Sequence, residues 1–273
     1  MSRRIAILID GGFFLKRLPR LVAAKHYATP EAVTKVMRLL CRNHVKTLTG
    51  SDGKRWLDHV YRIFFYDAAP YTGQAHHPLE NRQIDFAKSD TAVFRNALFE
   101  HLRRQRKVAL RLGKVNLEGD WAPPGHRVRK VLASRAWFAG LDLEAVDEHG
   151  GFTLTAAQVA EAKRLQKRWA EIEPHEVRLG LRQKGVDMRI GLDIASITLK
   201  QQADAILLVA GDSDFVPAAK LARREGREFI LDPLWQQVNQ DLFEHIDGLH
   251  SGLPKPRPRN PAAAAPAPEE DAT

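Results

Sequence analysis

The chain has a single cysteine, Cys41, among its 273 residues. One cysteine excludes an intrachain disulfide and is typical of proteins that work in a reducing compartment. The sequence has no apolar run near the roughly 20 residues that a membrane-spanning helix needs. The apolar run that follows Arg4 stops at Asp10, well short of a signal peptide. We therefore expect a cytoplasmic protein without a membrane segment.

Acidic residues are fewer than basic ones, and the net charge is +9. Residues 251–273 hold equal numbers of both, so the whole surplus belongs to residues 1–250. That excess favours a polyanionic partner such as a nucleic acid, although basic soluble proteins are common. Residues 251–273 also contain six prolines and a run of four alanines, and we expect a disordered tail there.

The most informative stretch runs from Ala205 to Phe215. Its first six residues are apolar without a polar break, which indicates a strand buried on both faces of a parallel sheet. Asp212 and Asp214 follow directly, where the strand gives way to a helix. In open α/β sheets, ligands bind at this carboxyl edge. The stretch therefore predicts an acidic site at the edge of a sheet.

Two further segments repeat this layout. The apolar strand Ile5–Ile9 ends in Asp10, and Asp187 stands at the start of another helix after Lys184-Gly185-Val186. Either strand-end site alone is explained slightly better by capping or turn formation than by a binding site. Together they predict a shared pocket whose charges repel unless a cation is bound. Aspartate oxygens, without cysteine or clustered histidine, favour Mg²⁺ or Mn²⁺ over zinc.

The remaining pattern alternates strands and helices and predicts an α/β fold. Further strands are expected near residues 59–66, 108–112, 174–182 and 227–231. Helices are expected near residues 13–18 (stopping at Pro19), 29–41, 92–102, 155–172, 187–200 and 238–249. Residues 70–78 are expected to form a loop. We predict one domain over residues 1–250, with a helical and irregular insertion at about residues 113–173.

Two runs of cations outside the acidic motifs are candidates for contacts with phosphate. Solvated surface is the more common role of such runs. The first run precedes a predicted strand and consists of Arg103, Arg104, Arg106 and Lys107. The second lies on the helix predicted at residues 155–172 and consists of Lys163, Arg164, Lys167 and Arg168.

Three segments, in this order, resemble the motifs of the NYN domain of PIN-like ribonucleases, in its LabA-like bacterial branch: Ile7–Gly12, Lys184–Asp187 and Val209–Phe215. The resemblance implies a Rossmann-like parallel sheet of order 3-2-1-4-5 and Mg²⁺- or Mn²⁺-dependent cleavage of RNA. It implies that the metal-binding and catalytic acids are Asp10, Asp187, Asp212 and Asp214. Many members of the family have an asparagine where this chain has Phe13, which removes a polar contact to metal-bound water or substrate.

Other residues are expected to support such a site. Asp193 lies about 120° around the helix from Asp187, so the two cannot share one face. Lys16, Arg182 and Lys184 are candidate phosphate contacts by position. The full supporting set is Gly11, Asp193, Ser213, Lys16, Arg182 and Lys184.

Alternative functions remain open at this stage. The first is a catalytically weak RNA-binding or regulatory module, in which Phe13 blocks the chemistry. A haloacid-dehalogenase-like phosphatase fits less well, because it needs a second aspartate where Gly12 stands. A Toprim-type nuclease needs glutamate on the first strand, where this chain has Asp10. The sequence leaves formation of a homo-oligomer open.

Overall fold

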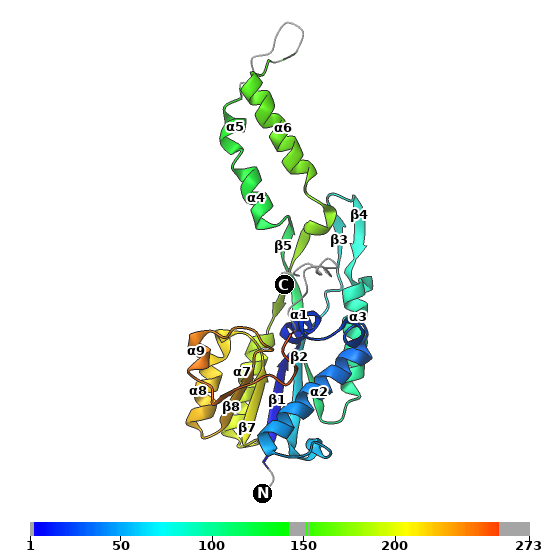
Figure 1. The fold of residues 1–273 in the computed structure, drawn as a ribbon. Helices are drawn as coiled ribbons and strands as arrows, with labels where there is room; N and C mark the ends of the chain where they lie inside the picture. The colour runs from blue at the N-terminus through cyan, green and yellow to red at the C-terminus, as the bar shows by residue number, and fades with distance from the viewer. Residues whose placement is uncertain (1–2, 142–150, 152, 257–273) are drawn as a thin grey trace. The chain divides into compact units, whose positions relative to one another are not determined.

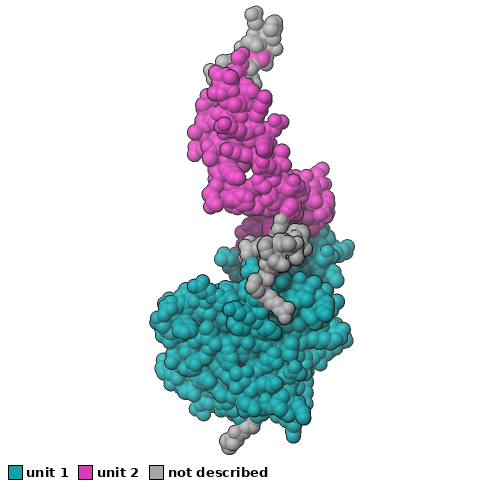
Figure 2. Space-filling view, viewed as in Figure 1, with its two compact units in different colours: residues 1–74, 85–116, 182–273 teal, residues 75–84, 117–181 magenta. Residues whose placement is uncertain are grey.

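The computed structural model describes residues 3–141, 151 and 153–256. This part of the chain forms two compact units (Figure 2). The first unit falls within residues 1–74, 85–116 and 182–273, and the second within residues 75–84 and 117–181. No helix among the described residues is long and apolar enough to cross a membrane.

A seven-stranded, mostly parallel sheet organises the first unit (Figure 1). Its strand order is β6-β5-β2-β1-β7-β8-β9. The fold is therefore the α/β class that the sequence predicts. The strands are β1 (Ile5–Asp10), β2 (Val60–Ala69), β5 (Val108–Ala122), β6 (Arg178–Lys184), β7 (Ala205–Val209), β8 (Glu228–Asp232) and β9 (Gly248–Leu249).

The two central strands are buried on both faces. In β1 and β7, which pair in parallel with Ile5 opposite Ala205, every residue from Ile5 to Ile9 and from Ala205 to Val209 is fully buried. Alternate side chains enter two separate cores. The apolar runs are explained by this double burial, since neither strand has a face for polar side chains.

Helices cover both faces of the sheet. One core includes side chains of α1, α2 and α3, and the other includes side chains of α7 and α8. α1 runs through Pro19 instead of stopping there, so that prediction was wrong. The bounds are α1 (Gly11–Leu21), α2 (Pro30–Thr49), α3 (Asp90–Arg103), α7 (Val186–Leu199) and α8 (Val216–Arg224), with 3₁₀ turns η1 (Ala24–His26), η2 (Trp56–His59), η3 (Phe86–Lys88) and η5 (Ser213–Phe215).

The second unit is more regular than the sequence indicates. β5 continues as a strand to Ala122, where irregular structure was expected, and a strand begins at Gln74 in the expected loop. The predicted capping box of α6 is present, with Thr155 and Gln158 bonded to each other's backbone. Residues 142–150 of the predicted insertion lie outside the described residues. The further elements of this region are β3 (Gln74–His77), β4 (Arg82–Asp85), α4 (Gly125–Leu132), α5 (Arg135–Ala139), α6 (Ala156–Ala170) and η4 (Pro174–Glu176).

The end of the chain differs from the prediction in two ways. The expected closing helix is only the short α9 (Gln240–Phe243), after which β9 adds an edge strand. The predicted tail also starts too early, because Leu253 is 2% exposed. In addition, Gly252 N–H donates to the buried carboxylate of Asp232 at 2.9 Å. The segment up to Leu253 is therefore part of the folded unit, and residues 257–273 lie outside the described residues.

Candidate functional site

The four predicted acids stand at the ends of strands or at the start of the next helix. Asp10 ends β1 and caps α1, its Oδ1 accepting the N–H of Phe13 at 3.0 Å. Asp212 follows β7 and caps η5, its Oδ1 accepting the N–H of Asp214 at 3.1 Å. Asp187 lies in the first turn of α7. Two of these acids therefore cap a helix as well as facing the sheet edge, which joins the two interpretations that the sequence left open.

Electrostatic coupling connects the four acids through Asp187, which is coupled to Asp10 on one side and to Asp212 and Asp214 on the other. The pKa of Asp10 is raised to about 6, mainly by burial; Asp187 and Asp67 also raise it, whereas the N–H groups of Phe13 and Gly12 lower it. The pKa of Asp187 is raised by burial and then by Asp212 and Asp214. Every cause acting on Asp187 raises its pKa. The structure thus gathers acids that are up to 204 positions apart in the sequence.

Gly185 explains why a glycine precedes the third acidic segment. It caps α7 with a φ of 76°, in the left-handed region where a side chain is strained. The chain therefore leaves β6 and enters α7 within one residue. This tight turn places Asp187 in the first helical turn, where the helix dipole favours a carboxylate.

Phe13 lies against the loop that leads to Asp212 and Asp214. A Cβ built on Gly211 would be 2.6 Å from the ring carbon Cε2 of Phe13. Only glycine lets the ring approach the backbone this closely. An apolar ring therefore separates the start of α1 from the loop before Asp212, at the position where many family members have an asparagine.

A fifth carboxylate, Asp67, was not predicted from the sequence. It is fully buried near the end of β2 and pairs with Arg95 of α3. Burial raises the pKa of Asp67, whereas Arg95 and the N–H of Ala68 lower it. The signal was present, because an acid follows the apolar stretch of β2, as it does those of β1 and β7. Among the described residues, only Asp67 of these five acids has an ion-pair partner.

Asp193 has a structural role instead of a place among the four acids. Its Oδ2 accepts the hydroxyl of Tyr66 at 2.8 Å and lies 3.3 Å from Nε of Arg111. These contacts tie the middle of α7 to β2 and β5. Asp193 therefore supports the position of α7, as its separation from Asp187 around the helix predicts.

The other supporting residues have varied surroundings. Gly11 is buried, and a Cβ there would be 2.5 Å from the carbonyl oxygen of Tyr66. Ser213 is half-buried in η5, and Lys16 is exposed on α1. Arg182 and Lys184 are exposed on β6. Gln183, which lies between them in β6, was not predicted to be near the site. A Cβ placed on Gly12 would be 3.4 Å from Oδ1 of Asp10 and 3.8 Å from Oε1 of Gln183, so both side chains approach Gly12.

The first predicted basic run is only partly available for phosphate. Nζ of Lys107 donates to the carbonyl of Leu57 at 2.8 Å and also to that of Val60. Arg103 pairs with Glu100. Arg104 and Arg106 are exposed. Lys107 thus fixes the start of β2, because its ammonium group is hydrogen-bonded to backbone oxygens. It is therefore less available for a phosphate contact.

The second basic run, on α6, divides in the same way. Arg164 lies 3.1 Å from Glu161, and Arg168 lies 3.8 Å from the same carboxylate. Lys163 and Lys167 are exposed, and neither forms an ion pair within the described residues. The two lysines are the stronger candidates for an anion contact.

The donor chemistry at the sheet edge suits Mg²⁺ or Mn²⁺. Asp10 and Asp212 each accept a backbone N–H on Oδ1 of the carboxylate. Mg²⁺ is typically held by one or two carboxylates and keeps several waters. Within the residues that the structure describes, no three His, Cys, Asp or Glu side chains form a ready-made cage for an ion.

Comparison with known protein families adds a separate observation. Residues 143–248 match the family model of the NYN domain. This segment is therefore similar to the NYN domain. The match confirms the family resemblance of the motifs and does not distinguish branches of the family. No match to the chain was found among curated proteins or among solved structures.

The matched segment of the NYN domain contains Asp187, Asp212 and Asp214, whereas Asp10 lies outside it. The sheet joins the two parts, because β1 pairs directly with β7. NYN domains are generally ribonuclease-like, and nucleases of this kind typically use divalent metals. The domain therefore indicates a nuclease-like function related to RNA.

Proposed function

We propose that this protein is a ribonuclease that depends on Mg²⁺ or Mn²⁺. The observation that supports the proposal most strongly is the mutual effect of acids from separate segments. Asp187 raises the pKa of Asp10 and has its own pKa raised by Asp212 and Asp214. Such repulsion costs stability unless a cation occupies the site. Perturbed acids gathered at one sheet edge are typical of functional sites.

Each acid has a distinct part in this proposal. Asp10, Asp187, Asp212 and Asp214 would hold the ion or ions through their free oxygens. A bound divalent ion supplies charge neutralisation at a phosphodiester and lowers the pKa of water. The cap bonds at Asp10 and Asp212 fix one oxygen of each carboxylate, so the other is oriented before any ion arrives. RNA contacts at the outer basic residues would track the backbone without reading sequence.

Cleavage of RNA by the purified chain tests the proposal. We expect hydrolysis with Mn²⁺ or Mg²⁺, none with chelator, and none with Asp187→Asn or Asp212→Asn. Glu225→Gln is the control, because it also removes one carboxylate charge but Glu225 is exposed at the C-terminal end of α8. Mn²⁺ binding by calorimetry should weaken in the first two variants and persist in the control. Cleavage that survives chelation, or that Asp212→Asn leaves intact, contradicts the proposal.

The position of Phe13 favours a second candidate, an RNA-binding module with weak catalysis. Its ring packs beside Gly211, where a polar side chain would reach bound water or substrate. Phe13→Asn distinguishes the two. If the ring limits turnover, Phe13→Asn raises the cleavage rate while RNA affinity changes little. If wild type binds RNA with metal present and cleaves none, the module is the better description.

A further inference from the structure

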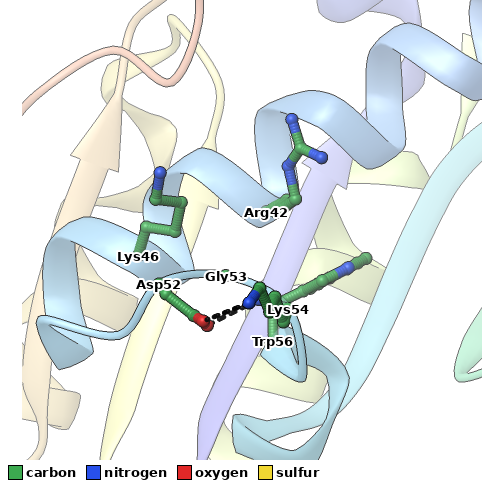
Figure 3. A pocket seen from close by; sticks show the side chains of 6 residues that line it. All are labelled: Arg42, Lys46, Asp52, Gly53, Lys54 and Trp56. Atoms are coloured by element: carbon green, nitrogen blue, oxygen red, sulfur yellow. Dashed lines mark hydrogen bonds and ion pairs between the residues drawn. The ribbon is translucent and has the colours of Figure 1, made fainter.

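A shallow groove on α2 is not used by the proposed reaction. It consists of two hollows, with volumes of about 360 and 290 Å³, that share Arg42 and Trp56. Figure 3 shows Arg42 and Lys46 extending from α2, with Lys54 and Trp56 on the segment that follows the helix. We call this surface the α2 groove; the residues that line it include Lys35, Arg38, Arg42, Lys46, Lys54 and Trp56.

The α2 groove carries a strong excess of positive charge. Lys35, Arg38, Arg42 and Lys46 recur at intervals of three or four residues and so share one face of α2. Lys54 adds a fifth cation. The only acid that lines the groove is Asp52, 3.8 Å from Lys54. Lys35 is paired with Glu31 at 2.8 Å, whereas Arg42 and Lys46 have no carboxylate partner within the described residues.

An aromatic ring fixes the middle of this row. Trp56 is 8% exposed and lines both hollows. The guanidinium of Arg38 lies 5.4 Å from the centre of the Trp56 ring, a cation–π contact. The contact orients one guanidinium at the groove, and a planar guanidinium suits phosphate oxygens.

The Trp56 end of the α2 groove lies at the opposite end of the central strands from Asp10. Trp56 belongs to η2, which ends immediately before the first residue of β2. Asp10 is the last residue of β1, which pairs in parallel with β2. The six residues of β1 span about 20 Å. The groove is therefore separate from the acidic cluster.

We propose that the α2 groove binds the phosphate backbone of single-stranded RNA at a distance from the cleavage site; the link to cleavage rests on the proposed function. Lys35 and Lys46 are eleven residues apart, about 16 Å along the helix. A row of this length suits a linear polyanion, which places several phosphates along it. A solvated basic face needs neither the paired hollows nor the oriented guanidinium. The groove extends the contact with long RNA and leaves short RNA unaffected.

The test uses Arg42→Ala/Lys46→Ala in the full chain, with Lys200→Ala/Lys220→Ala as a control of equal charge. Lys200 and Lys220 are exposed and lie outside the groove. Both doubles are made with and without Asp212→Asn, which prevents cleavage during binding assays. Fluorescence anisotropy over a salt series is measured with an oligonucleotide of about twenty residues. The groove double should bind more weakly and lose about 1.4 from the slope of log K against log salt, for two phosphate contacts.

Three comparisons decide the outcome. A dinucleotide has a single phosphodiester and is too short to reach across the about 20 Å of β1, so the two doubles without Asp212→Asn should cleave it equally. Arg42→Gln/Lys46→Gln, which keeps longer side chains, should reproduce the loss, and thermal melts should match wild type. An unchanged slope, or equal losses in the groove and control doubles, overturns the proposal. Absence of cleavage by wild type with Mn²⁺ would overturn the ribonuclease function alone, since binding is measured without cleavage.

Discussion

The backbone N–H of Phe13 donates a 3.0 Å hydrogen bond to Oδ1 of Asp10, so one carboxylate both starts α1 and faces other acids. The first role stabilises the fold at any pH at which the oxygen accepts the bond. The second destabilises it whenever the neighbouring carboxylates are charged. The two effects can be separated, because asparagine keeps the cap and removes the charge.

Asp10→Asn is expected to stabilise the metal-free protein at high pH. The pKa of Asp10 rises from 3.8 to about 6 on folding. Between these values the folded state binds more protons than the unfolded state, so the free energy of unfolding falls as pH rises. In chelator, the variant should gain about 1–3 kcal/mol above pH 6 and nothing near pH 4. Urea unfolding across pH measures this; a gain that is independent of pH contradicts it.

Removing the cation beside Asp67 should be strongly destabilising. Arg95 pairs with this fully buried carboxylate, and its loss leaves a buried charge without a partner. We expect Arg95→Ala to lower the free energy of unfolding by about 3–5 kcal/mol. Arg95→Ala combined with Asp67→Asn should recover part of the loss. Chemical unfolding of the two single variants and the double variant measures the coupling, and additive effects would show that the pair is not coupled.

Shortening the C-terminus should affect stability only when the cut passes Leu253. A chain that ends at His250 loses the burial of Leu253, about 1.5–3 kcal/mol. It also loses the Gly252 N–H bond to Asp232 and the bond from Trp235 Nε1 to the Leu253 carbonyl. A chain that ends at Pro256 keeps all three. Thermal melts should show a lower midpoint for the first truncation alone; equal midpoints would contradict the observed packing.

The two lysines of α6 should account for most RNA binding by that helix. Lys163→Ala/Lys167→Ala removes cations that have no acidic partner within the described residues, so the slope of log K against log salt should fall by about 1.4. Arg164→Ala/Arg168→Ala is the matched control, because both arginines lie near Glu161. The control should change the slope less. Filter binding over a salt series distinguishes them, and equal effects would mean that the pairing with Glu161 is weak.

The sequence alone determined the α/β fold class and the two central strands, and it named four acids as candidates for the site. Apolar runs such as Ala205–Ala210 predict double burial without knowledge of their partners, because a strand buried on both faces tolerates few polar side chains. Acids that directly follow such apolar runs can likewise be recognised from the sequence. The NYN domain match confirms the family to which the motifs point.

Only the tertiary structure decided which charges have partners. Arg95 and Asp67 are 28 positions apart, and Lys107 meets backbone carbonyls about 50 positions away. No local pattern encodes such contacts, so a paired cation and an available one look alike in the sequence. The same reason explains why the predicted tail starts too early, since Leu253 is buried by residues far away in the chain. Local periodicity determines elements, whereas long-range packing determines which side chains are available for function.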